Sequence, residues 1–310
     1  MAPGRADDGA GVRLRRSVLM TPAHQVDLLK KQAASAADVA CLDLEDSVPN
    51  RKKLLARECA ADALRRLTWG DKERVVRVNN MGDEFGPGDV EAMAAAGAEV
   101  VLLTKVRDSA DVDCAAAIID NVGTPTTIWC MIETAASLLH LDSIAMAPHV
   151  SGLFLGAGDL SLDLRVRAFG ATSRGRAGPP AASDILLYAR SRVVTAARAL
   201  GLTAIDSAMG RLDAEDVRAS AARAFEMGFD GKLIVTPAHI AIVHDAYLPT
   251  ADEVTWARRV IEALEEAERI GLGSAVVDGE PMDGPYLGYA LDVLARAEHS
   301  DLAFCGDGRQ

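Results

Sequence analysis

The stretch TTIWCMIETAASLLHLDSIAMAPHVSGLFLGAGD, residues 126–159, contains two apolar runs that each stop at an acidic residue. The first run ends at Glu133 and the second at Asp159. Continuous apolar runs of this length are typical of strands buried on both faces of a parallel sheet. A carboxylate at the end of such a strand costs free energy unless something pairs with it. Two of them on successive strands favour a hard cation such as Mg2+, completed by water and substrate, although either acid alone suits a helix cap or a solvated surface position.

The same alternation of apolar run and helical segment repeats along the chain. The apolar runs lie at 17–20, 39–44, 74–79, 100–105, 126–132, 151–156, 203–207 and 232–236. Ala-rich segments with helical spacing separate them, at 25–37, 51–67, 109–121, 184–200 and 214–227. Strand followed by helix, repeated, gives a parallel sheet with right-handed crossovers. Eight repeats in roughly 250 residues predict an α/β fold, a (β/α)8 TIM barrel with a C-terminal helical extension.

Composition and the two ends of the chain complete the expected organisation. We expect a disordered tail over 1–13, a catalytic barrel domain over 14–250, a helical extension over 251–300 that serves as lid and oligomer contact, and a disordered tail over 301–310. The net charge of −12 argues against nucleic acid as a partner, because a phosphate backbone needs a basic surface. The five cysteines show neither CxxC pairing nor zinc spacing, and the chain opens without an apolar leader. These features predict a reduced cytoplasmic protein that does not bind a membrane.

In such barrels the active site forms at the C-terminal ends of the strands. The polar residues expected at these ends are Glu45, Asp46, Arg77, Asn79, Lys105, Glu133, Asp159, Asp206 and Thr236. We expect mostly Ala, Val and Gly around the opposite, N-terminal ends. Lys232 begins its strand, which favours a stabilising role at that opposite face.

Several of these residues also suit purely structural roles. Glu45 and Asp46 could cap the helix that follows them. Arg77 could form an ion pair with Glu45 or Asp46. Lys105 could be a solvated strand end, and a Schiff-base role for it would require a desolvated pocket.

The motifs that follow one another along the chain carry a resemblance. SVLMTPA, DVACLDLEDSVPNRKKLLAR, VVRVNNMGDEFGPGDV, CMIETAASLLHLDSIA, GLFLGAGDLSLDL, MGFDGKLIVTPAHI and VVDGEPMDGP occur in the order typical of the citrate lyase beta-subunit-like family. That family, within the HpcH/HpaI aldolase superfamily, includes malyl-CoA and citramalyl-CoA lyases. The chain resembles it from about residue 16 to about residue 297.

The resemblance implies roles for matching positions. It implies that Glu133 and Asp159 are Mg2+ ligands and also contact substrate, and that Arg77 holds the substrate carboxylate or the developing oxyanion. Glu45 resembles an acid that orients water and substrate, with Asp46 behind it. The backbone around Ala157 and Gly158 resembles the segment that receives a keto-acid carboxylate. Asp283 resembles a C-terminal aspartate that acts as acid or base in a neighbouring subunit's site, which implies a homo-oligomer, a trimer or hexamer.

The implied activity is Mg2+-dependent cleavage or formation of a carbon–carbon bond in a malyl-, citramalyl- or citryl-CoA-like thioester. The products of cleavage are acetyl-CoA or propionyl-CoA and a 2-keto acid, formed through an enolate that the metal stabilises. Alternatives are a CoA-independent 2-keto acid aldolase, a thioesterase at the same metal, and a non-catalytic subunit. The chain has Thr104 where the family often has Pro and Thr236 where it often has His, and the second change bears on the use of CoA. The loop Phe169–Asp184 is either a lid or a flexible insertion, and Arg165, Arg167, Arg174 and Arg176 are candidates for contacts to CoA phosphates.

Overall fold

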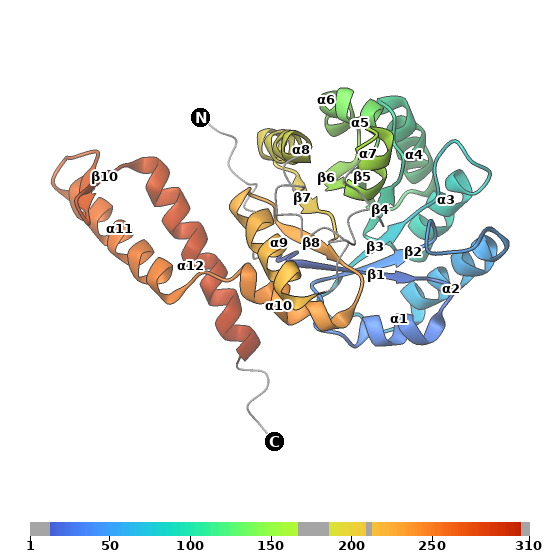
Figure 1. Ribbon diagram of the computed structural model, residues 1–310, viewed down its shortest axis with the longest axis horizontal. Coiled ribbons are helices and arrows are strands. Elements are labelled where there is room, and N and C mark those ends of the chain that lie inside the picture. The colour runs from blue at the N-terminus through green and yellow to red at the C-terminus, as the bar shows by residue number, and fades with distance from the viewer. Residues whose placement is uncertain (1–12, 167–185, 209–212, 305–310) are drawn as a thin grey trace, which may run out of the picture. The chain divides into compact units, whose positions relative to one another are not determined.

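A computed structural model describes residues 13–166, 186–208 and 213–304, with side chains up to residue 298 (Figure 1). Within these residues, eight parallel strands close into a barrel in the order β1 to β8, and β8 pairs with β1. The strands are β1 (Ser17–Pro22), β2 (Val39–Asp43), β3 (Glu73–Arg77), β4 (Val100–Leu103), β5 (Thr127–Ile132), β6 (Val150–Leu155), β7 (Thr203–Asp206) and β8 (Gly231–Ile234). The predicted (β/α)8 barrel is confirmed.

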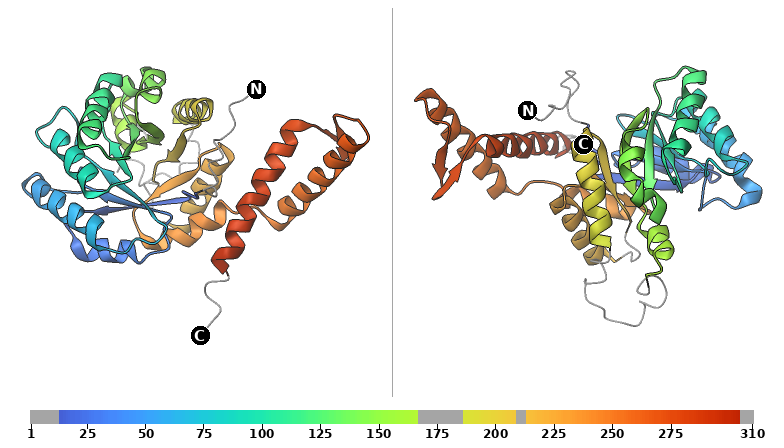
Figure 2. Two further views of the ribbon diagram at one scale, coloured as in Figure 1. Left: turned by 180° about the vertical axis from the view of Figure 1, so that it is seen from behind. Right: turned by 90° about the horizontal axis from the view of Figure 1, so that it is seen from above.

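Helices lie outside the ring of strands (Figures 1 and 2). They are α1 (Val26–Ala33), α2 (Lys53–Arg66), α3 (Gly86–Ala96), α4 (Ser109–Val122), α5 (Ala135–Leu139), α6 (Leu141–Ala145), α7 (Ala157–Asp163), α8 (Leu187–Leu200), α9 (Ala214–Glu226) and α10 (Ile240–Ala246), with short 3-10 turns η1 (Asn50–Lys52) and η4 (Pro237–His239). The sequence did not mark α3, whose start carries two glycines and a proline. Proline suits the first turn of a helix, where its missing N–H has no partner to lose.

Alternate residues of each strand fill the barrel interior. The buried cluster there comprises Val18, Val39, Cys41, Val75, Val100, Leu102, Trp129, Met131, Phe154 and Ile205. Gly152 makes room for the largest of them, because a Cβ at this position would lie 2.6 Å from Cδ1 of Trp129. Side chains two residues further along a strand share the same face, so the pattern leads to Asp43, Arg77 and Glu133 at the C-terminal end.

The N-terminal end of the barrel is closed by ion pairs, so the expectation of mostly Ala, Val and Gly there was wrong. Arg15 donates two hydrogen bonds to Glu73, with Nε–Oε2 and Nη2–Oε1 distances of 2.5 and 2.8 Å. Its guanidinium lies 6.0 Å from the centre of the Trp129 ring. Arg16 pairs with Asp38 in the same two-pronged way, at 2.8 and 2.9 Å. Asp38 also accepts the backbone N–H of Arg16 at 2.9 Å. Acids at this end therefore satisfy both arginines and strand N–H groups that begin the sheet.

Lys232 is structural, but it does not act at the N-terminal face. Its buried Nζ donates to Oδ2 of Asp206 at 2.7 Å and to the carbonyl of Ser207 at 2.5 Å, at the C-terminal end of β7. The register pairs Asp206 with Lys232, because the strands of a barrel are staggered. Asp206 also accepts from Nε of Arg190 on α8 at 3.1 Å. This pairing removes Asp206 from the candidate site residues.

The chain forms two compact units, the barrel unit Met1–Ala246 and a second unit, Tyr247–Gln310. In its described part, α11 (Ala251–Arg269) and α12 (Gly284–Phe304) pack around a buried cluster that includes Val260, Val277 and Met282. The hairpin of β9 (Ala275–Val277) and β10 (Glu280–Met282) turns at Asp278 and Gly279, whose φ angles of 54° and 86° suit a two-residue type I′ turn. No helix in the described residues is long and apolar enough to cross a membrane.

The predicted tails fall mostly outside the described residues. Of 1–13, the structure describes Arg13, whose Nη1 lies 2.7 Å from Oε1 of Glu99. Of 301–310, it describes residues 301–304, which end α12.

Candidate active site

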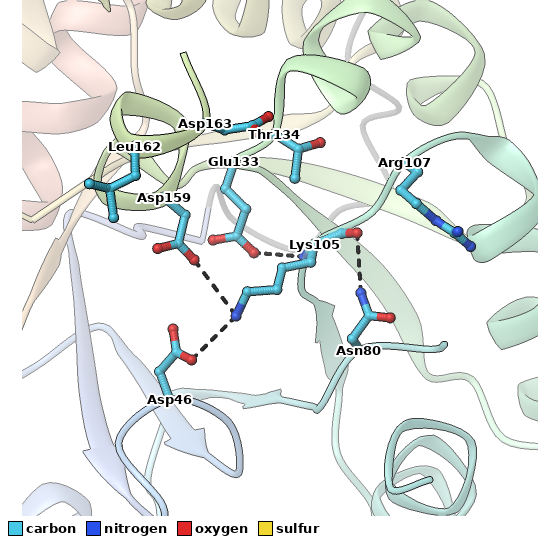
Figure 3. A pocket seen from close by; sticks show the side chains of 9 residues that line it. All are labelled: Asp46, Asn80, Lys105, Arg107, Glu133, Thr134, Asp159, Leu162 and Asp163. Atoms are coloured by element: carbon cyan, nitrogen blue, oxygen red, sulfur yellow. Dashed lines mark hydrogen bonds and ion pairs between the residues drawn. The ribbon is translucent and has the colours of Figure 1, made fainter. Parts of the chain in front are cut away.

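A cavity of about 540 Å³ opens among the segments that follow strands β2 to β6. It is lined by Asp46, Asn80, Lys105, Arg107, Glu133, Thr134, Asp159, Leu162 and Asp163 (Figure 3). All of them come after the C-terminal ends of strands, where the sequence places the site. Glu133 and Asp159, the two predicted metal ligands, are on its wall.

Glu133 is a buried carboxylate whose charge is balanced by few polar contacts. The residue is 4% exposed, and within the described part of the chain its side chain accepts one hydrogen bond, from the backbone N–H of Lys105 to Oε1 at 2.6 Å. Burial raises its pKa to about 8, and the negative charges of Glu45 and Asp159 add to the rise. Gly156 permits this placement, because a Cβ there would lie 2.4 Å from Cβ of Glu133 and 2.7 Å from its Oε2. The site thus holds an acid that favours either a proton or a nearby cation.

Asp159 lies in the first turn of α7, directly after β6. Its side chain is 37% exposed, and Oδ2 lies 3.7 Å from Nζ of Lys105. Ala157 and Gly158 begin the same helix, and the N–H of Ala157 donates to Oγ of Ser207 at 3.2 Å. Neither of these two is among the residues that line the cavity, so the predicted carboxylate-receiving role of this backbone stays a prediction.

Lys105 is the residue that sequence reasoning set aside and the structure places at the centre of the site (Figure 3). Its Nζ donates to Oε1 of Glu45 in a short contact and lies 3.3 Å from Oδ1 of Asp46. Burial alone would lower its pKa, but the hydrogen bond and charge of Glu45 outweigh burial and raise it. The sequence could have indicated this, because Lys105 ends a strand that lies between the strands ending at Glu45 and at Glu133.

Arg77 and Asp43 form a buried pair behind the cavity. Nε and Nη2 of Arg77 donate to the two carboxylate oxygens of Asp43 at 2.6 and 2.7 Å, and Nη1 lies 3.3 Å from Oε2 of Glu45. Asp43 also accepts the N–H groups of Glu45 and Ser47 at 2.9 and 3.1 Å. Burial would raise the pKa of Asp43, but the hydrogen bonds and charge of Arg77 hold it below its ordinary value. The ion pair considered for Arg77 thus exists, with Asp43 as main partner and Glu45 as second.

Glu45 connects this pair to the cavity. Lys105 contacts Oε1 of Glu45, and Oε2 of Glu45 lies near Arg77 and accepts the backbone N–H of Asp46 at 2.9 Å. Burial raises the pKa of Glu45, Arg77 and Lys105 oppose this rise, and Asp46 adds to it, so that the pKa lies above its ordinary value. Capping is the wrong description for Glu45 and Asp46, because Pro49 and Lys52 occupy the capping positions of η1 and α2 and neither helix has a side-chain cap. Among the described residues, the cavity wall includes Asp46 but neither Glu45 nor Arg77.

Two further predictions concern Asp283 and the loop Phe169–Asp184. Asp283 lies in the second unit with an exposed side chain, and its carbonyl accepts the N–H of Tyr286 at 3.0 Å. Its role in a neighbouring subunit's site stays a prediction. The loop Phe169–Asp184, with Arg174 and Arg176, lies outside the described residues, as does Arg167.

Arg165 and Thr236 are described. Arg165 is exposed just after α7, with φ of 56°. Thr236 accepts the N–H of Ala238 at 3.4 Å and caps η4.

Comparison with known proteins settles the family. The model of the HpcH/HpaI aldolase/citrate lyase family matches residues 16–237. The chain belongs to this family. It is 37% identical over 284 residues to a (3S)-malyl-CoA thioesterase of Cereibacter sphaeroides, covering 91% of this chain and 94% of the relative. It is 35% identical over 299 residues to the citrate lyase subunit beta of Escherichia coli K12, covering 94% and 95%. The family is one of aldolases and lyases, as the motifs predicted.

Solved relatives agree with the fold and carry ligands. The CitE protein of Mycobacterium tuberculosis, in complex with magnesium, acetoacetate and coenzyme A, matches with a TM-score of 0.75 and 32% identity over 93% of this chain and all of that one. The citrate lyase beta subunit of M. tuberculosis, in complex with oxaloacetate and magnesium, matches with a TM-score of 0.63 and 32% identity over 76% of this chain and 98% of that one.

Proposed function

We propose that this chain is a Mg2+-dependent carbon–carbon lyase that cleaves or forms a short hydroxy-dicarboxylic acyl-CoA. The observation that carries the proposal is Glu133, a buried carboxylate that forms no ion pair with the described residues, on the same cavity wall as Asp159. Relatives that share about a third of the sequence were solved with magnesium together with coenzyme A or oxaloacetate. The substrates we propose are malyl-, citramalyl- or citryl-CoA-like thioesters, with acetyl-CoA or propionyl-CoA and a 2-keto acid as products.

The donor set fits magnesium. Glu133 and Asp159 would hold the cation, and Mg2+ is commonly bound by one or two carboxylates with water and substrate completing its shell. Among the described residues, no group of three or more His, Cys, Asp and Glu side chains is arranged to hold a metal, and the proposed site uses two carboxylates completed by water and substrate. Bound magnesium supplies a Lewis acid that polarises substrate oxygens.

The chain's own residues supply orientation and proton transfer. Cleavage breaks the carbon–carbon bond next to the carbinol carbon. The hydroxyl loses its proton as it becomes the keto oxygen, and the bonding electrons move to the thioester's α-carbon, which then takes up a proton. Asp43 fixes Arg77, which in turn lies against Glu45, so the geometry of Glu45 is set by a buried network. We assign Arg77 to substrate or oxyanion stabilisation, Glu45 with Asp46 to orienting water and substrate, and Asp283 to proton transfer.

The role of Asp283 is proposed together with a homo-oligomer, a trimer or hexamer, in which it serves the neighbouring subunit. Mixing the Glu133→Gln and Asp283→Asn variants under conditions of subunit exchange tests this assignment. Recovery of activity from two inactive variants supports a shared site, and persistent inactivity contradicts it.

A second candidate is thioester hydrolysis at the same site. The relative named (3S)-malyl-CoA thioesterase, at 37% identity, favours it. In that reaction water attacks the thioester carbonyl, and the products are the free hydroxy acid and the CoA thiol. The two reactions therefore differ in whether free thiol appears.

The test is an assay of the purified chain with Mg2+ in both directions. Acetyl-CoA and propionyl-CoA are each offered glyoxylate, pyruvate and oxaloacetate, and malyl-CoA and citramalyl-CoA are offered for cleavage. Products are identified by mass spectrometry, with a thiol reagent for free CoA. We expect acyl-CoA and keto acid without stoichiometric thiol.

Stoichiometric thiol identifies a thioesterase, and turnover of keto acids without any thioester identifies a CoA-independent aldolase. Keto-acid binding without turnover would leave a non-catalytic subunit. Glu133→Gln is the inactive control, and Asp62→Asn, which removes an exposed acid of α2 paired with Arg66, is the matched active control.

A further inference from the structure

Lys105 contacts both residues proposed as magnesium ligands. Its backbone N–H donates to Oε1 of Glu133 at 2.6 Å, and its Nζ lies 3.7 Å from Oδ2 of Asp159. The same ammonium reaches Glu45 and Asp46. The Lys105 side chain therefore contacts three carboxylates while its backbone N–H binds the fourth. Figure 3 shows its contacts to Asp46, Asp159 and Glu133.

The backbone at Lys105 is held in an uncommon conformation. Its φ of 51° is in the left-handed region, which residues other than glycine rarely adopt. Nδ2 of Asn80 donates to the carbonyls of Thr104 and Lys105, both at 3.2 Å, and clamps this turn. A left-handed residue persists where its surroundings impose it, and such positions cluster at functional sites. Here the turn aims the N–H at Glu133 and the side chain at the acids.

The ammonium also balances the charge of the cavity. Glu45, Asp46, Glu133 and Asp159 bring four carboxylates together, and Arg77, whose main partner is Asp43, reaches only Glu45 among them. A unit charge about 4 Å from a carboxylate changes the attraction of that carboxylate for a cation by a large factor when water is partly excluded. A divalent cation held by Glu133 and Asp159 would meet this ammonium at close range.

We propose that Lys105 is a positioning residue that orients Glu133 through its backbone and competes with the divalent cation through its ammonium. Before the cation binds, the ammonium holds Glu45, Asp46 and Asp159 together. When the cation binds, the ammonium releases Asp159 and keeps Glu45 and Asp46 in place. This inference rests on the proposed function, because it takes Glu133 and Asp159 as the cation ligands.

The test measures binding of Mn2+ alone, by the loss of the free-ion electron paramagnetic resonance signal, at one pH and ionic strength. Removing the competing charge in Lys105→Met or Lys105→Gln is expected to tighten Mn2+ binding about tenfold. Lys105→Arg keeps the charge and is expected to bind within about threefold of the unchanged protein. Lys30→Met, which removes an exposed lysine of α1, is the matched control and is expected to leave binding unchanged.

Turnover separates positioning from simple structural support. In Lys105→Met we expect kcat to fall while Mn2+ binds more tightly, because Glu45 and Asp46 lose their anchor. Equal or weaker Mn2+ binding by both neutral variants overturns the inference and leaves the proposed function standing. Absence of Mn2+ binding by the unchanged protein overturns the proposed cation site and this inference with it.

Discussion

The two ends of the barrel each contain a buried glutamate, and the two carboxylates differ in the partners that balance their charge. Glu73, at the N-terminal end, and Glu133, at the C-terminal end, are each 4% exposed. Glu73 receives two charge-assisted hydrogen bonds from Arg15, at 2.5 and 2.8 Å. In the described residues Glu133 receives one backbone N–H, and its pKa is raised by burial and further by the charges of Glu45 and Asp159. At the N-terminal end the buried glutamate is paired with an arginine, whereas at the C-terminal end several carboxylates lie close together around a cavity.

The difference separates charge that supports the fold from charge that is available to a ligand. A buried ion pair contributes little net stability, yet losing one partner leaves an uncompensated charge and is strongly destabilising. A buried carboxylate without a partner lowers the free energy of unfolding, and binding of a cation to it offsets this cost. We therefore expect substitutions at the two ends to affect different measured quantities.

The largest effect is expected from Glu133→Gln. The variant loses a proposed cation ligand, and since Lewis-acid stabilisation is worth several kcal/mol, we expect kcat/KM to fall about 10³-fold or more. Its structure should remain intact, because an amide suits the buried position better than a carboxylate. Steady-state assays with the acyl-CoA identified above measure the loss, and a fall of less than tenfold would contradict the assignment.

Glu73→Gln is expected to act on stability. It leaves Arg15 without its charged partner, and because the Arg15 side chain is 27% exposed, the loss should be about 1–3 kcal/mol in the free energy of unfolding. Urea unfolding followed by circular dichroism measures it. kcat well below the unfolding temperature should stay within about threefold of the unchanged protein. A large drop in kcat with normal stability would mean that the comparison between the two ends is wrong.

The pH dependence of cation binding sharpens the comparison. With a pKa of about 8, Glu133 in the cation-free protein is mostly protonated at pH 7 and ionised at pH 9. A cation must displace that proton, so affinity should rise by up to about tenfold per pH unit below 8 and level off above it. Calorimetry with Mg2+ from pH 6.5 to 9 measures the profile. In Glu133→Gln the rise should disappear.

The same shift has a consequence for stability, with the opposite sign to that of most acids. Because the pKa of Glu133 is raised from 4.5 to about 8 on folding, the native state keeps the proton that the unfolded chain releases. The contribution of this group favours the fold most below pH 4.5 and is lost as the pH rises to about 8. Without a divalent cation at pH 8.5, Glu133→Gln should therefore be more stable than the unchanged protein, by on the order of a few kcal/mol.

The smallest effect is expected from Asp46→Asn. The Asp46 side chain is 58% exposed and touches Lys105 at 3.3 Å. Exposed ion pairs contribute little, so kcat/KM should change by no more than about fivefold. A loss as large as that of Glu133→Gln would show that any acid around the cavity serves equally.

The barrel was predictable because burial on both faces leaves continuous apolar runs, such as VVLL in β4 and TIWCMI in β5. Glu133 and Asp159 were predictable because an acid that ends such a run stands out. Asp43 was missed because it lies inside the run VACLDL, and the two acids that directly follow this run, Glu45 and Asp46, were taken as the end of the strand. The Arg15–Glu73 and Asp206–Lys232 pairs were missed because they join residues 58 and 26 positions apart. Such pairing depends on the stagger of the strands, which periodicity does not encode.

The most direct test of the account is the thermal unfolding midpoint as Mg2+ is titrated at pH 8.5, for the unchanged protein, Glu73→Gln and Glu133→Gln. A ligand that binds the native state raises the midpoint by an amount that grows with the logarithm of one plus the ratio of ligand concentration to Kd. We predict that Mg2+ raises the midpoint of the unchanged protein and of Glu73→Gln alike, the latter from a lower starting value, and leaves Glu133→Gln unmoved. A midpoint of Glu133→Gln that rises as much as that of the unchanged protein would contradict the claim that the acids at the C-terminal end of the barrel hold the cation.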